Sequence, residues 1–157
     1  MSLFISAKED AHYFSMDDVA NGWSRVSEHG FELDGEYWPT VEHYYQAMKF
    51  DNASDKDAVK AAKTARQARK VGGGWFKKKR PDWKQVELTV MTRAVYIKMR
   101  THPEIASLLL ATQEQMLVED SQFDYFWGCG RDKRGTNHYG QILMNVRDKL
   151  RLLKSES

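Results

Sequence analysis

Trp38-Pro39-Thr40-Val41-Glu42-His43-Tyr44-Tyr45-Gln46-Ala47-Met48-Lys49-Phe50 is the stretch that decides the fold. Its apolar residues recur at positions i, i+3, i+4 and i+7, which predicts one buried helix face made of Val41, Tyr44, Tyr45 and Met48. Thr40 stands where its hydroxyl can cap the first free backbone N–H groups. A second row lies beside this face at i, i+4 and i+7 and consists of Glu42, Gln46 and Lys49.

This polar row has two interpretations, a surface ladder on an amphipathic helix or a ligand site. Glu42 falls in the first helical turn, where the helix dipole favours an ionised carboxylate. Trp38, Tyr45 and other rings crowd the same stretch, and flat rings beside a carboxylate suit a nucleobase-like ring. The residues alone leave both interpretations open.

The whole chain has the composition of a globular protein, with 157 residues of which 41% are hydrophobic and 29% charged. This length predicts a single domain, residues 1–157. No apolar run approaches the length of about 18 residues that a membrane span needs, and the N-terminus lacks the apolar core of a signal peptide. Cys129 is the single cysteine, which excludes an intramolecular disulfide and favours a reducing compartment. We therefore expect a cytoplasmic protein without membrane contact.

The segments before the central stretch predict two strand regions. Leu3-Phe4-Ile5 is expected to form a short strand, followed by a long polar loop that reaches about His29. Residues 31–38 then alternate apolar and polar side chains around Asp34-Gly35, which is a strong hairpin signal.

The segments after the central stretch predict helices. One helix is expected to open at Ser54 and to break at Thr64, before Gly72-Gly73-Gly74 ends the region. Asp82 is expected to cap a long core helix. Pro103 fits the first turn of a shorter helix with three inward-facing residues, Ile105, Leu108 and Leu109.

The last third of the chain predicts a strand, an aromatic loop and a final helix. Residues 116–119 read as the strand, and Asn137 is expected to cap the helix. Between them lies Phe123-Asp124-Tyr125-Phe126-Trp127-Gly128-Cys129-Gly130-Arg131, an aromatic loop with one acid and with glycines that allow a close backbone approach to a ligand. A basic turn follows, with Lys133 and Arg134.

Several classes of site are disfavoured by the sequence. The five histidines show no HExxH pairing and one cysteine cannot build a zinc site, so we expect no metal. GxGxxG and P-loop motifs are missing, so we expect no cofactor. Cys129 is better explained as a small residue in a tight loop than as a nucleophile.

Anion binding must come from local clusters, because the net charge is only +2. Trp75-Phe76-Lys77-Lys78-Lys79-Arg80 is one such cluster, which either grips phosphate or nucleic acid or forms a solvated basic loop. The basic turn forms a second cluster, with Arg131, Lys133 and Arg134.

Two acids, Glu42 and Asp124, are each embedded among aromatic residues. That combination fits cleavage of a C–N bond at an anomeric carbon, because a carboxylate both stabilises an oxocarbenium-like state and activates water. The alternative is that both acids only cap or pair structurally. A binding module for a nucleotide or nucleic acid, without catalysis, is the competing class, although such a module has no need for two acids in its pocket.

Several of these motifs, in the same order, resemble the NADAR or YbiA-like family. The resemblance spans most of the chain and is carried by residues 37–50, 82–91, 108–112, 117–119, 124–128 and 137–147. The chain departs from the family pattern at Met16-Asp17-Asp18, where the family commonly continues with Asn and an aromatic residue.

The resemblance implies an N-glycosidase that hydrolyses early phosphorylated intermediates of riboflavin biosynthesis, releasing ribose 5-phosphate and a reactive aminopyrimidine. Disposal of such damaging metabolites is the proposed benefit in the family, and other members remove ADP-ribose from guanine. The resemblance gives Glu42 the role of catalytic carboxylate, with Asp124 and Trp127 completing the catalytic site. Further residues are expected to bind substrate, namely Trp83, Lys49, Tyr45, Asn137, Arg131, Lys133 and Arg134.

The sequence as a whole predicts a mainly helical α+β protein, one compact YbiA-like domain with a small antiparallel sheet near the hairpin. Glu42, Asp124 and Trp127 are expected to line one cleft. One basic cluster, or Lys49 in its place, is expected to hold the substrate phosphate. The sequence makes no prediction of oligomeric state.

Overall fold

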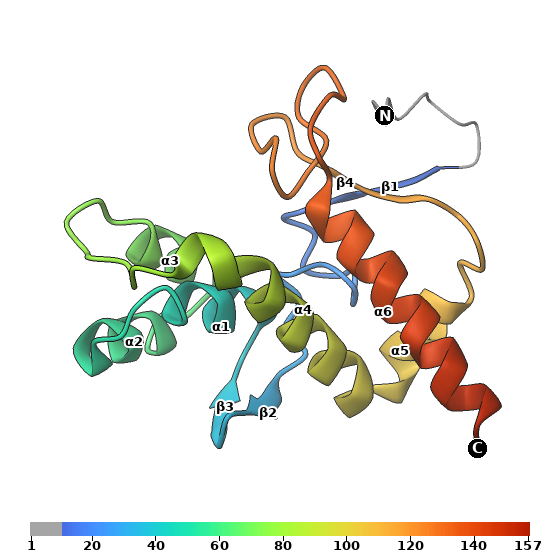
Figure 1. The fold of residues 1–157 in the computed structure, drawn as a ribbon, viewed down its shortest axis with the longest axis horizontal. Coiled ribbons are helices and arrows are strands. Elements are labelled where there is room, and N and C mark those ends of the chain that lie inside the picture. The colour runs from blue at the N-terminus through green and yellow to red at the C-terminus, as the bar shows by residue number, and fades with distance from the viewer. Residues whose placement is uncertain (1–10) are drawn as a thin grey trace. The chain divides into compact units, whose positions relative to one another are not determined.

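The computed structural model describes residues 11–157 and shows the mainly helical α+β fold that the sequence predicts (Figure 1). The expected strand at residues 3–5 lies outside the described residues. In chain order the elements are β1 (His12–Ser15), β2 (Phe31–Leu33), β3 (Glu36–Trp38), α1 (Val41–Ala47), α2 (Ala53–Lys60), α3 (Ala65–Gly72), α4 (Trp83–Thr101), α5 (Pro103–Leu110), β4 (Leu117–Asp120) and α6 (His138–Ser155).

These elements pack into two compact units. The central unit is Arg25–His102, and the terminal unit combines the described residues up to Ser24 with Pro103–Ser157. The single domain expected from chain length stays a prediction. No helix among residues 11–157 has both the length and the apolar character required to cross a bilayer.

The hairpin of the central unit is confirmed. β2 and β3 pair antiparallel, with Phe31 opposite Trp38. Asp34 and Gly35 both have positive φ, 56° and 78°, as a tight two-residue hairpin turn requires. The Trp38 indole donates to the Leu33 carbonyl at 3.1 Å, which ties the end of the hairpin to its turn.

Helix α1 forms the middle of the central unit. As predicted, the Thr40 hydroxyl caps it by accepting the His43 backbone N–H at 3.1 Å. All seven residues of the helix are buried, so its polar row does not face solvent. The surface-ladder interpretation is therefore wrong, because neighbouring elements cover every side of this short helix.

Helices α2 and α3 confirm the predicted break but not the predicted start. Asn52 begins α2 in place of Ser54, because its side-chain oxygen accepts the backbone N–H groups of Ser54 and Asp55. Thr64 caps α3, as its capping-box form indicates.

Helix α4 provides the longest core face of the central unit. Its buried apolar residues are Trp83, Val90, Met91, Ala94, Val95 and Met99. Asp82 stands at the N-cap position, but its side chain makes no capping bond. The carboxylate is engaged instead by the Arg80 guanidinium, at 2.6 and 2.9 Å.

The terminal unit contains a strand pair that the sequence analysis missed. β1 lies within the predicted long loop and pairs in parallel with β4, with His12 opposite Leu117. Pro103 begins α5 as expected, and Ile105 and Leu109 are buried, but Leu108 is 61% exposed and does not face inward. Asn137 precedes α6 without capping it.

Candidate active site

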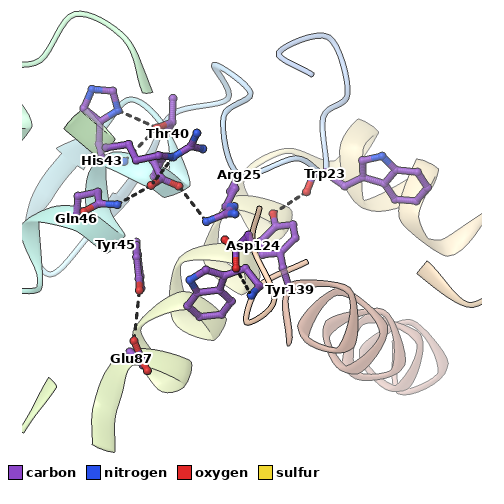
Figure 2. Close-up of polar contacts among 12 residues, drawn as sticks. Trp23, Arg25, Thr40, His43, Tyr45, Gln46, Glu87, Asp124 and Tyr139 are labelled. Atoms are coloured by element: carbon purple, nitrogen blue, oxygen red, sulfur yellow. Dashed lines mark hydrogen bonds and ion pairs between the residues drawn. The ribbon is translucent and has the colours of Figure 1, made fainter. Parts of the chain in front are cut away.

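The Glu42 carboxylate is the centre of a buried polar cluster in the central unit. Its side chain is fully buried, and the Oε1 atom accepts hydrogen bonds from the Gln46 amide at 2.7 Å and from Arg69 Nε at 3.3 Å. Arg25 Nη1 lies 3.6 Å from the other oxygen, Oε2 (Figure 2). Two guanidinium groups and one amide therefore fix the plane and charge of this carboxylate.

Two contacts at the start of α1 hold the neighbouring segments around Glu42. The Glu42 backbone N–H donates to the Arg25 carbonyl at 3.0 Å, which holds the preceding loop against the start of α1. His43 Nε2 lies 2.8 Å from the Ala62 carbonyl and its Nδ1 lies 2.7 Å from the Thr40 hydroxyl. Because a carbonyl can only accept, Nε2 carries the proton and Nδ1 accepts. This imidazole fastens α1 to the segment that leads into α3.

The second oxygen of Glu42 has a different environment from the first. Among the described residues, Oε2 is buried and accepts no hydrogen bond. A buried acceptor without a donor is costly, so native structures rarely keep one without a reason. The arrangement holds Oε1 rigidly and leaves Oε2 as an acceptor for a ligand or a water.

Next to Glu42, aromatic residues and one lysine lie along α1 and just beyond its end. The Tyr45 ring lies 5.2 Å from the buried Trp83 ring. The Tyr45 hydroxyl donates to Glu87 at 3.4 Å (Figure 2). Lys49 Nζ lies 5.4 Å from the centre of the Tyr45 ring, within the range of a cation–π contact. Burial, followed by the charge of Lys79, lowers the pKa of Lys49 to about 8.

This shift predicts a pH dependence of stability. Between about pH 8 and 10.5 the unfolded chain holds a proton on Lys49 that the folded chain has lost, so the free energy of unfolding rises with pH in that window. At pH 7 the free energy of unfolding of a Lys49→Met variant should exceed that of the wild type by about 2 kcal/mol, so the variant should melt at a higher temperature. The difference between the two proteins should shrink by pH 10. Thermal melts of both proteins at three pH values test this. A variant that melts below the wild type at pH 7 would contradict it.

In the terminal unit, Asp124 and Trp127 lie in a loop that closes on itself. Asp124 Oδ1 accepts the backbone N–H groups of Phe126 at 3.0 Å and Trp127 at 2.8 Å. The Trp127 ring is buried and meets the Phe126 ring edge-on at 4.8 Å. Gly128 permits a close approach, as predicted, but to the chain itself, because an added Cβ would stand 2.9 Å from the Glu119 carbonyl oxygen.

Asn137, which was expected to bind substrate, has a structural role. The residue is buried and its backbone is in the left-handed conformation, with φ 55°. The side-chain oxygen accepts the Glu119 N–H and the amide nitrogen donates to the Leu117 carbonyl, both at 2.9 Å. The side chain thus pairs with β4 as a third strand would. It is a positioning group for the loop that precedes it.

The remaining predicted residues of the terminal unit are on its surface. Arg131, Lys133 and Arg134 are exposed. Lys133 Nζ lies 4.9 Å from the Tyr13 ring, and Arg134 lies 3.9 Å from Asp132. Cys129 is fully buried, and burial raises the pKa of its thiol, which fits a small residue in a tight loop better than a nucleophile.

The structure therefore groups the predicted site residues within each unit. The central unit holds Glu42, Tyr45, Lys49 and Trp83, and the terminal unit holds the others. The single cleft expected for Glu42, Asp124 and Trp127 stays a prediction. Sequence reasoning missed Arg25 and Arg69, since an isolated arginine in a polar loop and one of several cations on a basic helix carry no local signal of their target.

Comparisons with known proteins agree with this architecture. The model of the NADAR domain family matches residues 3–151. The chain is 43% identical to the N-glycosidase Npun_R5314 of Nostoc punctiforme over 136 residues, covering 85% of this chain and 87% of that protein. It is 37% identical to the chloroplastic riboflavin biosynthesis protein PYRR of Zea mays, covering 88% of this chain and 25% of that protein.

A solved structure is similar as well. The NMR structure of the E. coli protein YbiA superposes with a TM-score of 0.85 at 33% identity, covering 94% of this chain and 89% of that chain. The curated protein from that species carries the name N-glycosidase YbiA and is also 33% identical, covering 91% of this chain and 89% of that protein. The chain therefore belongs to the NADAR domain family, as an enzyme of the N-glycosidase class.

Proposed function

We propose that this enzyme hydrolyses the N-glycosidic bond of phosphorylated ribosylaminopyrimidine intermediates of riboflavin biosynthesis, releasing ribose 5-phosphate and an aminopyrimidine. The observation that carries the proposal is the Glu42 carboxylate, buried and fixed through Oε1 while Oε2 accepts no hydrogen bond from the described residues. The names of relatives from maize and from Vibrio vulnificus, both riboflavin biosynthesis proteins, support the substrate class.

In the proposed reaction, Glu42 Oε2 accepts a proton from a water molecule while the water oxygen attacks the anomeric carbon. A C–O bond forms as the C–N bond breaks, and the electron pair of that bond leaves with the pyrimidine amine, which takes up a proton from solvent. Glu42 then releases its proton to solvent. The carboxylate also stabilises the positive charge that develops on the sugar ring. Gln46 and Arg69 keep Oε1 in place, so the carboxylate need not reorganise during the step.

Other residues complete the proposed site. The tilted pair of Tyr45 and Trp83 is proposed to hold the pyrimidine ring, because an aromatic pair beside the Glu42 row suits a flat heterocycle. Asp124 and Trp127 are proposed to complete the catalytic site from the terminal unit, with Asn137 positioning their loop.

The direct test is to incubate the purified protein with a ribosylaminopyrimidine phosphate and, separately, with ADP-ribosylated guanine, and to identify the products by mass spectrometry. Release of ribose 5-phosphate from the first compound supports the proposal. Release of ADP-ribose with no reaction of the first compound would replace the substrate class. Binding of either compound without any cleavage would indicate a binding module.

Gly72 offers a test of how strictly Glu42 is positioned. An added Cβ at Gly72 would stand 2.4 Å from Gln46 Oε1 and 2.7 Å from Gln46 Cβ, so Gly72→Ala must displace the amide that holds Glu42. We expect the rate to fall by about 10-fold, since small misplacements of catalytic groups are costly. Gly74→Ala is the matched control, because its nearest neighbour is at 3.6 Å. Equal rates for the two variants would show that Gln46 does not position the carboxylate.

A further inference from the structure

Lys49 is a buried cation whose ammonium lies over the face of the Tyr45 ring. Only 8% of the residue is exposed, yet among the described residues its ammonium makes no hydrogen bond or ion pair. The carboxylates of Glu42 and Glu87 both act on Lys49. Two guanidinium groups engage Glu42, however, and the Tyr45 hydroxyl donates to Glu87. Withdrawing an ammonium from water without a counter-ion is unfavourable, so its retention in this position calls for a ligand of opposite charge.

A second lysine is brought to the same place by the loop between α3 and α4. The Arg80 backbone N–H donates to the Lys49 carbonyl at 2.7 Å, which fixes the end of this loop beside the end of α1. Lys79 directly precedes that anchor; its residue is exposed, and its positive charge lowers the pKa of Lys49 in addition to burial. Two neighbouring ammonium groups repel each other, and an anion bound between them relieves that repulsion.

Two other cations of the same loop are engaged by the chain itself. The Arg80 guanidinium pairs with Asp82, and Lys77 Nζ lies 5.8 Å from the centre of the Phe50 ring. Of the remaining two lysines, Lys78 and Lys79, it is Lys79 whose charge acts on Lys49. Lys49 Nζ also lies over the Tyr45 ring, which meets the Trp83 ring at a tilt, so the cation borders a buried aromatic pair.

We propose that Lys49 and Lys79 form the subsite for the phosphomonoester group of the substrate, an inference that rests on the proposed function. A phosphomonoester carries close to two negative charges at neutral pH, which two ammonium groups balance as point charges. The site distinguishes phosphorylated from dephosphorylated N-glycosides. The exposed residues Arg131, Lys133 and Arg134 then contribute little to phosphate binding.

Calorimetric binding of ribose 5-phosphate and of ribose tests the subsite without reference to catalysis. The wild type should bind ribose 5-phosphate more tightly than ribose. Lys49→Met should weaken ribose 5-phosphate binding by about 10- to 100-fold and Lys79→Met by about 3- to 10-fold, with ribose binding unchanged. Lys78→Met, next to Lys79 in the same loop, is the matched control and should bind as the wild type does. Circular dichroism verifies that each variant is folded.

Two results would overturn the subsite. One is unchanged ribose 5-phosphate binding in both lysine variants, and the other is loss of binding on joint replacement of Arg131, Lys133 and Arg134. Assays with phosphorylated and dephosphorylated substrate separate this inference from the proposed function. Hydrolysis of both compounds with equal kcat/KM would contradict the phosphate subsite and support the proposed function. Lysine-dependent binding of ribose 5-phosphate without hydrolysis of either compound would support the subsite and contradict the proposed function.

Discussion

Glu42→Gln is expected to lower the single-turnover rate of N-glycoside hydrolysis by at least about 100-fold while ligand affinity changes far less. The amide keeps the size of the side chain and can still accept the Gln46 hydrogen bond. It loses the basicity that activates water and the negative charge that faces the developing cation. Because Arg25 and Arg69 lose their counter-ion, we also expect a stability cost of about 1 to 3 kcal/mol.

Rate and melting temperature must therefore be measured on the same protein, well below the transition. Glu36→Gln is the control, since it makes the same chemical change at an exposed ion pair with Lys60 in the same unit. A Glu42→Gln variant that turns over at the wild-type rate would remove Glu42 from the mechanism. A loss of stability with an unchanged rate would leave the buried carboxylate a purely structural role.

Gly140→Ala is expected to destabilise the protein by about 3 kcal/mol or more. Gly140 lies in α6 where β4 passes, and an added Cβ would stand 2.1 Å from the Leu117 carbonyl oxygen and 2.4 Å from the Asn137 amide nitrogen. Backbone cannot yield as a flexible side chain can, so the strand and the helix must separate. That separation breaks the hydrogen bonds by which Asn137 holds β4.

Urea denaturation of Gly140→Ala beside Gly74→Ala measures this effect. Both variants replace a glycine by alanine, but a Cβ at Gly74 would make only an ordinary contact, since the nearest atom would be 3.6 Å away. We expect a clear loss in midpoint only for Gly140→Ala. Equal midpoints would mean that α6 and β4 can move apart at little cost.

The parts of the fold that can be predicted from the sequence are those determined by contacts between residues close together in the chain. Thr40, Asp34-Gly35 and Thr64 act on residues within three or four positions, so their turns and caps can be recognised from the chain alone. Asn137 shows the limit, because its position before α6 was correct but its side chain bonds to a strand about 20 residues earlier in the chain.

The candidate site shows the same division. Glu42, Tyr45 and Lys49 could be placed together because α1 carries the first two and Lys49 follows directly after its C-cap. Their partners Arg25 and Arg69 come from segments with no periodic signal toward α1, and only the packing of the central unit selects them. β1 was missed for a similar reason, since a four-residue strand with one buried side chain becomes recognisable only when β4 lies beside it.

The pairing of β1 with β4 also has a consequence for the order in which the protein folds. The terminal unit combines two separate segments, residues 11–24 and 103–157, whereas the central unit is one continuous segment. During synthesis the central unit has all of its residues available first, while β1 must wait for β4 and α6 to emerge. Closing so long a loop costs conformational entropy before its contacts form, which slows folding. We therefore expect Arg25–His102 to gain protection from proteolysis early on the ribosome, and the terminal unit to gain it only after the last helix is released.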